Sequence, residues 1–259
     1  MTADPSAAGP APDGARLPDE SRPADGRLSP DGSQAPDLSR PPDGARPTDR
    51  LRRDLALLGS LIPPGARVLD LGCGHGSLLR HLQAERGCVV QGVEIDDQSV
   101  LTAIRRGVPV IELDIDHELN NFDDQAYDVV VLSKTVQAVR RPAEVLRQMA
   151  RIAPRSIVSM PNFAHWRNGL RLLAGHAPVS KDLPYAWHDS PNVHFGSLAD
   201  LEELFAGLGL KVERCIPLDP AGRRARCPLG LRNWLASAAL YELSGPPATA
   251  ALARPTPAA

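Results

Sequence analysis

Two kinds of segment alternate along the middle of this chain, and the alternation is the strongest constraint on its fold. Runs of branched apolar residues, such as RVLDL at 67–71, are typical of strands buried on both faces. Segments with apolar residues at helical spacing, such as SLLRHLQAE at 77–85, lie between them. Such alternation predicts an α/β fold, a mainly parallel seven-stranded sheet with helices on both faces. The predicted strands are 67–71, 88–95, 108–113, 127–133, 156–160, 211–218 and 236–243, and the predicted helices are 49–62, 77–85, 97–106, 141–152 and 197–209.

Local signals mark several helix ends. We expect Asp97 and Ser197 to cap the helices that follow them, because a carboxylate or hydroxyl oxygen can accept a hydrogen bond from the first turn. Pro142 fits a first helical turn, where no N–H is needed. Gly209 fits the position just past a helix end.

Three glycines stand at alternate positions where the first predicted strand meets the next helix, at Gly72, Gly74 and Gly76. Glycine costs conformational entropy, so this turn needs either positive φ or a close backbone approach by a ligand. The spacing GxGxG differs from the GxGxxG of dinucleotide sites. Asp70, two residues earlier, would repel a pyrophosphate but suits a ligand that carries an ammonium group. The alternative is a tight turn that binds no ligand.

Two further acids end the next two predicted strands. Glu94 follows the glycines by about twenty residues, a position at which a carboxylate can accept both hydroxyls of a ribose. Asp114 is placed to meet an adenine amino group. Each acid alone could be a solvated residue at a strand end, but acids and glycines in register at successive strand ends indicate one shared ligand. The predicted ligand-binding residues are Asp70, Gly72, Cys73, Gly74, Gly76, Glu94, Ile95, Asp114, Ile115 and Ser133.

These motifs carry a family resemblance. VLDLGCGHGSLL, GVEIDD, LDID and YDVVVLS together resemble the class I S-adenosylmethionine (SAM)-dependent methyltransferases over about residues 51–243. The resemblance implies a Rossmann-like fold and SAM, or S-adenosylhomocysteine, as the bound cofactor. The blocks PNFAHW and PYAWHDSPNVH resemble a narrower family, the methionine biosynthesis protein MetW. His75 and Lys181 stand where that family usually has an acid and an arginine.

The narrower resemblance implies a function in methionine biosynthesis, in which the chain binds and activates a homoserine O-acyltransferase. A second hypothesis is an active methyltransferase with an unidentified small-molecule acceptor, which an activity assay would distinguish. The third, a nicotinamide-dependent oxidoreductase, is disfavoured by the GxGxG spacing and by Asp70.

The two unusual blocks follow the fifth predicted strand and are rich in aromatic, His and Asn residues, although aromatic residues make up only 4% of the chain. We expect them to form a lid or a partner surface beside the cofactor; the alternative is a satellite cluster that anchors a long loop. His165 is a weak candidate for a catalytic base, and no metal site is expected. The predicted lid or partner residues are Asn162, Phe163, His165, Trp166, Tyr185, Trp187, Asp189, Asn192 and His194.

Composition separates one predicted domain, residues 50–244, from two tails. Ten of the 26 prolines fall in residues 1–49, which contain few large apolar residues, so we expect this segment to be disordered. Residues 245–259 are expected to form a second disordered tail. The four cysteines lack CxxC spacing, the net charge is −2, and no apolar run is long enough for a membrane helix. We therefore expect a cytoplasmic protein that binds neither nucleic acid nor membrane.

Overall fold

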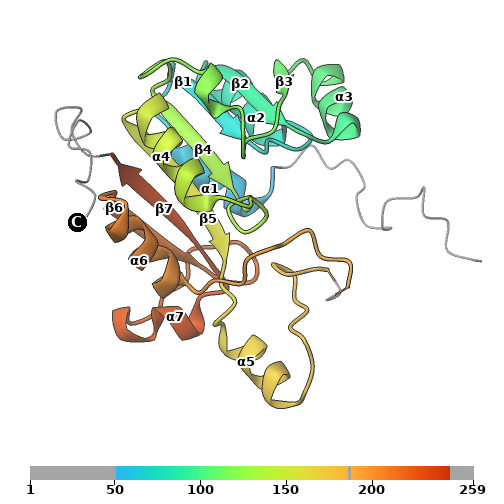
Figure 1. Ribbon diagram of the computed structural model, residues 1–259, viewed down its shortest axis with the longest axis vertical. Helices are drawn as coiled ribbons and strands as arrows, with labels where there is room; N and C mark the ends of the chain where they lie inside the picture. The colour runs from blue at the N-terminus through green and yellow to red at the C-terminus, as the bar shows by residue number, and fades with distance from the viewer. Residues whose placement is uncertain (1–50, 186–187, 246–259) are drawn as a thin grey trace, which may run out of the picture. The chain divides into compact units, whose positions relative to one another are not determined.

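The computed structural model describes residues 51–185 and 188–245 (Figure 1). The chain divides into two units, Met1–Pro47 and Thr48–Ala259, and every described residue belongs to the second. The predicted tail 1–49 lies outside the described residues, as does all but the first residue of the predicted tail 245–259.

Seven strands form one sheet, which confirms the predicted fold class. The strands are β1 (Arg67–Leu71), β2 (Val89–Glu94), β3 (Val110–Glu112), β4 (Val129–Ser133), β5 (Arg155–Pro161), β6 (Lys211–Leu218) and β7 (Ala238–Ser244). Their order is β3-β2-β1-β4-β5-β7-β6, and the first five are parallel to one another. β7 lies antiparallel between β5 and β6. Because β5 and β6 both run antiparallel to β7, the carboxyl end of β6 shares an edge with those of β1 to β5.

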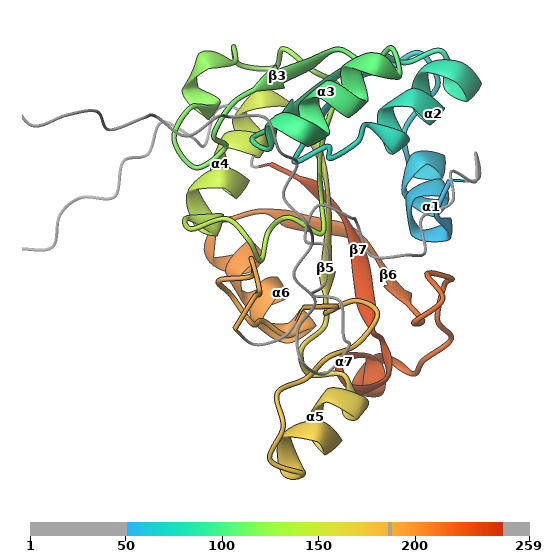
Figure 2. The same ribbon diagram turned by 90° about the vertical axis from the view of Figure 1, so that its right-hand side faces the viewer.

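Helices cover both faces of this sheet. Figure 2 shows α1 and α2 on one side of the strands and α4 and α6 on the other. Among the described residues, no helix is both long and apolar enough to cross a membrane. The α-helices are α1 (Arg53–Leu61), α2 (Ser77–Arg86), α3 (Asp97–Arg105), α4 (Pro142–Ile152), α5 (Trp166–Leu173), α6 (Leu198–Gly207) and α7 (Arg232–Leu235), and the 3₁₀ helices are η1 (Leu119–Asn121) and η2 (Leu229–Leu231).

The side chains of the central strands alternate between two hydrophobic cores. In β4, Val129 and Val131 pack with residues of α1 and α2, while Val130 and Leu132 pack with residues of α4 and α6. All four are fully buried, as expected for a strand covered on both faces. Because β1 to β5 are parallel, their carboxyl ends lie along one edge of this sheet, where the glycines and acids were predicted to meet.

Most of the predicted helix ends are confirmed, with one correction. Ser197 accepts a hydrogen bond from the Asp200 N–H in a capping box, Pro142 begins α4, and Gly209 has φ of +69° just after α6. The prediction that Asp97 caps α3 is wrong. Asp96 is the cap, because its extended backbone lets its carboxylate accept from the Ser99 N–H at 2.8 Å.

The long segment between β5 and α6, residues 162–197, contains a helix that was not predicted. This helix, α5, lies away from the helices that cover the sheet in both views of the chain (Figures 1 and 2). Trp166, Leu170 and Leu173 are spaced at i, i+4 and i+7, so the sequence did carry a helical signal here. All three side chains are exposed, Leu173 by 86%. The segment 162–197 is called the insertion below.

Candidate functional site

The three glycines of the loop after β1 all have positive φ, but they serve different purposes. A Cβ on Gly72 would lie 2.7 Å from Thr135 Oγ1, and one on Gly76 would lie 3.1 Å from Ala103 Cβ. These two glycines are therefore needed so that the loop can pack against its neighbours. Apart from its chain neighbours, no heavy atom of the described residues lies within 4 Å of the Cβ position of Gly74, so its backbone is open to a ligand.

Asp70 is a buried carboxylate with an unpaired oxygen at the carboxyl end of β1. It is 3% exposed, and its Oδ1 has no hydrogen-bond partner among the described residues. Burial, together with the nearby charge of Glu94, raises the pKa of Asp70 to about 8. An unpaired buried acid is costly unless something satisfies it. A cationic group on a ligand would do so, and this fits the ammonium group expected from the sequence.

Glu94 fixes the geometry of the glycine loop. Its Oε2 accepts from the Gly74 N–H at 2.7 Å, and its Oε1 accepts from the N–H groups of Ile95 at 2.9 Å and Asp96 at 3.2 Å. One carboxylate therefore joins the turn after β2 to the loop after β1. Beside it, the side chain of Ile95 is 63% exposed and offers an apolar surface.

The other predicted cofactor residues are already engaged within the protein. Asp114 Oδ1 accepts from the Asp116 N–H, and its Oδ2 lies 2.8 Å from His117 Nδ1. Burial alone would raise the pKa of Asp114, but these hydrogen bonds outweigh it and lower the pKa. Ser133 Oγ lies 3.1 Å from Ser159 Oγ. Ile115 packs against the core.

Cys73 lies in the glycine loop but is not poised to react. Burial, and then the charges of Asp70 and Glu94, raise the pKa of its thiol to about 12. A Cβ on Gly92 would lie 2.6 Å from Cys73 Sγ, so the thiol fills the space beside β2. Cys73 is thus a neutral packing residue in the ligand-free loop.

Two of the predicted lid residues are buried anchors rather than exposed surface. Asn162 is 1% exposed, and its Nδ2 donates to the carbonyl oxygens of Asn233 at 2.7 Å and Ala236 at 2.8 Å. His165 is 6% exposed, and burial lowers its pKa, so the imidazole is neutral. Asn168, which the sequence did not indicate, donates to the carbonyl oxygens of Asn162 and Phe163. The start of the insertion is therefore hydrogen-bonded to the segment that leads from α7 into β7.

The remaining lid residues lie at or near the surface. Trp166 and Tyr185 are 39% and 46% exposed, and Phe163 contacts the exposed Phe195 with ring centroids 5.2 Å apart. Asp189 and His194 are exposed, and Asn192 is half-buried. Trp187 lies outside the described residues. Exposed apolar side chains thus occur both on α5 and at the end of the insertion.

Two residues after β4 were missed by the sequence analysis. Lys134 has φ of 55°, and its Nζ lies 2.8 Å from Asp182 Oδ1 in the insertion. Gln137 is buried, and its Oε1 has no hydrogen-bond partner among the described residues. Its carbonyl oxygen accepts from the N–H groups of Val193 and His194. The only sequence signal was their position after a strand end, on the ligand side of the sheet. Together they attach the insertion to the loop after β4.

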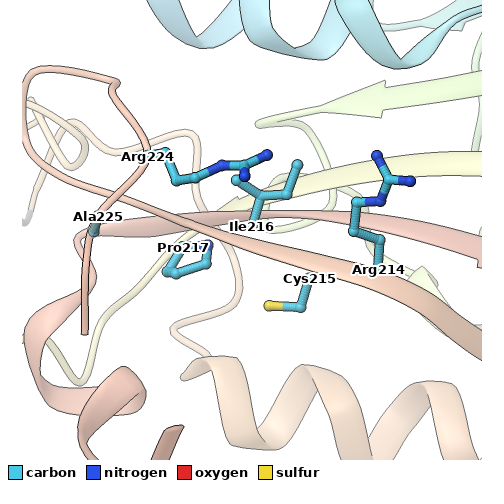
Figure 3. A pocket seen from close by; sticks show the side chains of 6 residues that line it. All are labelled: Arg214, Cys215, Ile216, Pro217, Arg224 and Ala225. Atoms are coloured by element: carbon cyan, nitrogen blue, oxygen red, sulfur yellow. The ribbon is translucent and has the colours of Figure 1, made fainter. Parts of the chain in front are cut away.

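Neither of two cavities in the described structure contains a predicted cofactor residue. One, of about 250 Å³, lies over β6. Figure 3 shows that Arg214, Ile216 and Arg224 point to one side of this strand while Cys215 and Pro217 point to the other, so the lining side chains do not converge. The second, of about 310 Å³, lies at the carboxyl edge and includes Lys134 and Asp182.

Solved structures share this fold. A chain of the complex between the Haloferax volcanii Trm112 methyltransferase activator and a methyltransferase has a TM-score of 0.57 at 19% identity, covering 76% of this chain and 91% of that one. A SAM-dependent methyltransferase of Thermotoga maritima gives 0.55 at 18% identity, covering 75% and 88%. The [4+2]-cyclase SpnF gives 0.55 at 16%, covering 75% and 81%. The class is therefore that of the class I SAM-dependent methyltransferase fold.

Sequence comparison narrows the class to one family. The profile described as "Methionine biosynthesis protein MetW" matches residues 52–243, and the chain belongs to this family. The "Bifunctional methionine biosynthesis protein MetXA/MetW" of Rhodopirellula baltica is 34% identical over 165 residues, 59% of this chain and 26% of that protein. "Ubiquinone biosynthesis O-methyltransferase" of Neisseria meningitidis is 28% identical over 133 residues, 48% of this chain and 56% of that protein. The matches span about a quarter and about half of these two relatives.

Proposed function

We propose that this MetW-family protein binds SAM and acts as an accessory factor that activates a homoserine O-acyltransferase. The observation that supports SAM binding is the buried Oδ1 of Asp70, which has no partner among the described residues, together with the open backbone of Gly74 four residues later. The fold alone cannot carry it, because SpnF is a cyclase on the same fold.

The residues at the strand ends fit SAM. Asp70 would bind the ammonium group, and the open backbone at Gly74 would lie against the methionyl part. Glu94 would accept the ribose hydroxyls, with Ile95 against the adenine ring and Asp114 near its amino group. When bound, SAM supplies a methyl group on a sulfonium. Whether or not that group is transferred, these side chains would bind and orient the molecule.

The partner proposal is supported by a relative and by a surface. The R. baltica relative carries MetXA and MetW in the name of one bifunctional chain, which supports a partner of the MetX type. The apolar surface on α5 and the insertion, which includes Trp166, Leu173 and Phe195, is exposed. Exposed aromatic and apolar side chains that gather on one surface are typical of protein interfaces. Since α5 lies away from the sheet, it can contact a partner without disturbing the core.

The hydrogen bonds and the ion pair that attach the insertion support a link between SAM binding and activation of the partner. The insertion is bonded to the loop after β4 through Lys134 and Gln137, and Thr135 between them lies against Gly72 of the glycine loop. If the glycine loop has two conformations and SAM binds one of them more tightly, SAM will increase the population of that conformation. The exposed surface on α5 would shift with it through these contacts. The partner would then change SAM affinity by the same factor.

The alternative is an active methyltransferase with an unidentified small-molecule acceptor. A neutral His165 could accept a proton from such an acceptor, although its burial leaves little access. A methylation assay with labelled SAM, with and without the acyltransferase, would distinguish this alternative from the accessory function.

A surface substitution tests the partner proposal. Leu173→Asp places a charge on the most exposed apolar side chain of α5, and Ile104→Asp is a matched control on α3, where Ile104 is 52% exposed. We expect Leu173→Asp to lose capture and activation of the acyltransferase from the same genome while SAM titration stays unchanged. The control should keep both. Full activation by Leu173→Asp would contradict the proposed surface, and a wild type that binds no SAM would contradict the cofactor proposal.

A further inference from the structure

The cavity of about 310 Å³ at the carboxyl edge is built by four separate parts of the chain. Its volume is at the lower end of the range typical of small-ligand sites. Parallel strands present ligand sites at this edge. Lys134, which lines the cavity, directly precedes Thr135, and Thr135 contacts Gly72 of the glycine loop. The lining residues of the cavity are Arg52, Arg53 and Asp54 at the start of α1, Lys134 after β4, Lys181 and Asp182 in the insertion, and Pro220, Ala221 and Gly222 after β6.

Four of the charged residues of this cavity neutralise one another. Lys134 Nζ lies 3.3 Å from Asp54 Oδ2 and 2.8 Å from Asp182 Oδ1. The Arg52 guanidinium donates to both carboxylate oxygens of Asp54, at 3.2 and 3.1 Å. Burial would raise the pKa of Asp54, but Arg52 and Lys134 outweigh it and lower the pKa, so the carboxylate is charged. Both aspartates are thus occupied by cations.

Two further basic residues of the cavity have no such partner. Among the residues that the structure describes, neither Arg53 nor Lys181 makes an ion pair. The lining therefore has four basic and two acidic side chains, with an excess of two positive charges. Arg53 and Lys181 are both exposed, and an excess of positive charge along a cleft attracts anions.

The backbone at Lys134 supports a function for this cavity. Its φ of 55° is uncommon for a residue with a side chain, and such conformations cluster at functional sites. The Lys134 N–H donates to the carbonyl oxygen of Ser159 at 2.9 Å and to Ser159 Oγ at 3.0 Å. These bonds hold the backbone in place, and the ion pairs with Asp54 and Asp182 position the ammonium on the cavity wall.

We propose that this cavity is a second ligand site, which binds a small molecule bearing a carboxylate or phosphate group through Arg53 and Lys181. Lys134 fixes the wall between Asp54 and Asp182. The site goes beyond the proposed function, because neither SAM binding nor the partner surface requires it. A ligand there would contact α1, the loop after β4, the insertion and the loop after β6 together.

Calorimetric titration of the full-length protein tests this site. The probes are succinate and inorganic phosphate, which distinguish the two anionic chemistries, with succinamide as the neutral control. We expect saturable binding of at least one anion and none of succinamide. Arg53→Gln combined with Lys181→Gln should weaken that binding by at least about tenfold, because two charge-assisted hydrogen bonds are lost. Arg80→Gln combined with Arg105→Gln, a matched pair of exposed arginines on α2 and α3, should leave it unchanged.

The outcomes separate this site from the cofactor proposal. The absence of saturable binding by both anions overturns the second site, as does equal binding by the wild type and the Arg53/Lys181 double variant. SAM is titrated into the same proteins, and its affinity should be unaltered in the double variant. If the wild type does not bind SAM, the cofactor proposal is refuted, and the anion-binding result is unaffected.

Discussion

Replacing Asp70 by Asn should stabilise the ligand-free protein at pH 8 and weaken SAM binding. Burial and the charge of Glu94 raise the folded-state pKa of Asp70 from 3.8 to about 8. The folded state therefore holds a proton that the unfolded state has lost between pH 4 and pH 8. The contribution of Asp70 to the free energy of unfolding is therefore fully present below the unfolded-state pKa. It is lost as the pH rises from there through the folded-state pKa. Asn resembles the protonated acid and does not titrate.

The size of the effect follows from the shift. Each pKa unit corresponds to about 1.4 kcal/mol, so about four units set an upper limit of about 6 kcal/mol on the advantage of Asp70→Asn at pH 8. At pH 4 the two proteins should be equally stable within about 1 kcal/mol. For SAM, losing a charge-assisted contact to the ammonium group should cost about 1.5–3 kcal/mol, or about ten- to hundredfold in affinity.

Urea unfolding of both proteins at several pH values between 4 and 8 measures the first effect, and calorimetric SAM titration measures the second. Subtracting the two unfolding curves removes the other titrating groups that they share. A stability difference that does not grow with pH, or an Asp70→Asn variant that binds SAM as the wild type does, would refute the assigned burial and function of this carboxylate.

Three further predictions concern the glycine loop and the N-terminal segment. Gly72→Ala should destabilise the protein more than Gly74→Ala by about 1–3 kcal/mol in chemical unfolding, because only the former meets Thr135; equal losses would contradict the loop geometry. Glu94→Ala should lower SAM affinity at least about tenfold in titration, with the fold retained by circular dichroism, since the contacts of its carboxylate with the ligand and with Gly74 are lost; unchanged affinity would contradict the ribose assignment. Deletion of residues 1–48 should leave the melting temperature within a few degrees of the wild type, because the composition offers little to bury; a larger drop would mean that this segment packs on the domain.

The geometry of the glycine loop could be predicted from the sequence more completely than that of the insertion. Gly72 and Gly76 require glycine for steric reasons that follow from a tight strand-to-helix turn, which the sequence marks directly. Asn162 and His165 were predicted as lid or partner residues, yet both are buried. Side-chain type alone cannot distinguish a buried Asn that bonds backbone carbonyls from an exposed Asn at an interface. The contacts of Asn162 come from residues more than 70 positions later in the chain.

The sequence by itself determined the seven strands and the five helices that cover the sheet, together with the residue types at the strand ends, but α5 and α7 were not predicted from it. Strand and helix patterns arise from neighbouring residues, and β6 was predicted with its observed bounds, 211–218. Only the tertiary structure decided that β7 lies between β5 and β6 and that a cavity forms around Lys134. It also decided that Asp70 Oδ1 has no partner among the described residues. Lys134 and Asp182 are 48 residues apart in sequence, and their ion pair forms because the insertion after β5 returns to the loop after β4. Which charged side chains are buried and which are paired depends on contacts between distant segments at the carboxyl edge of the sheet, so no local sequence pattern predicts it.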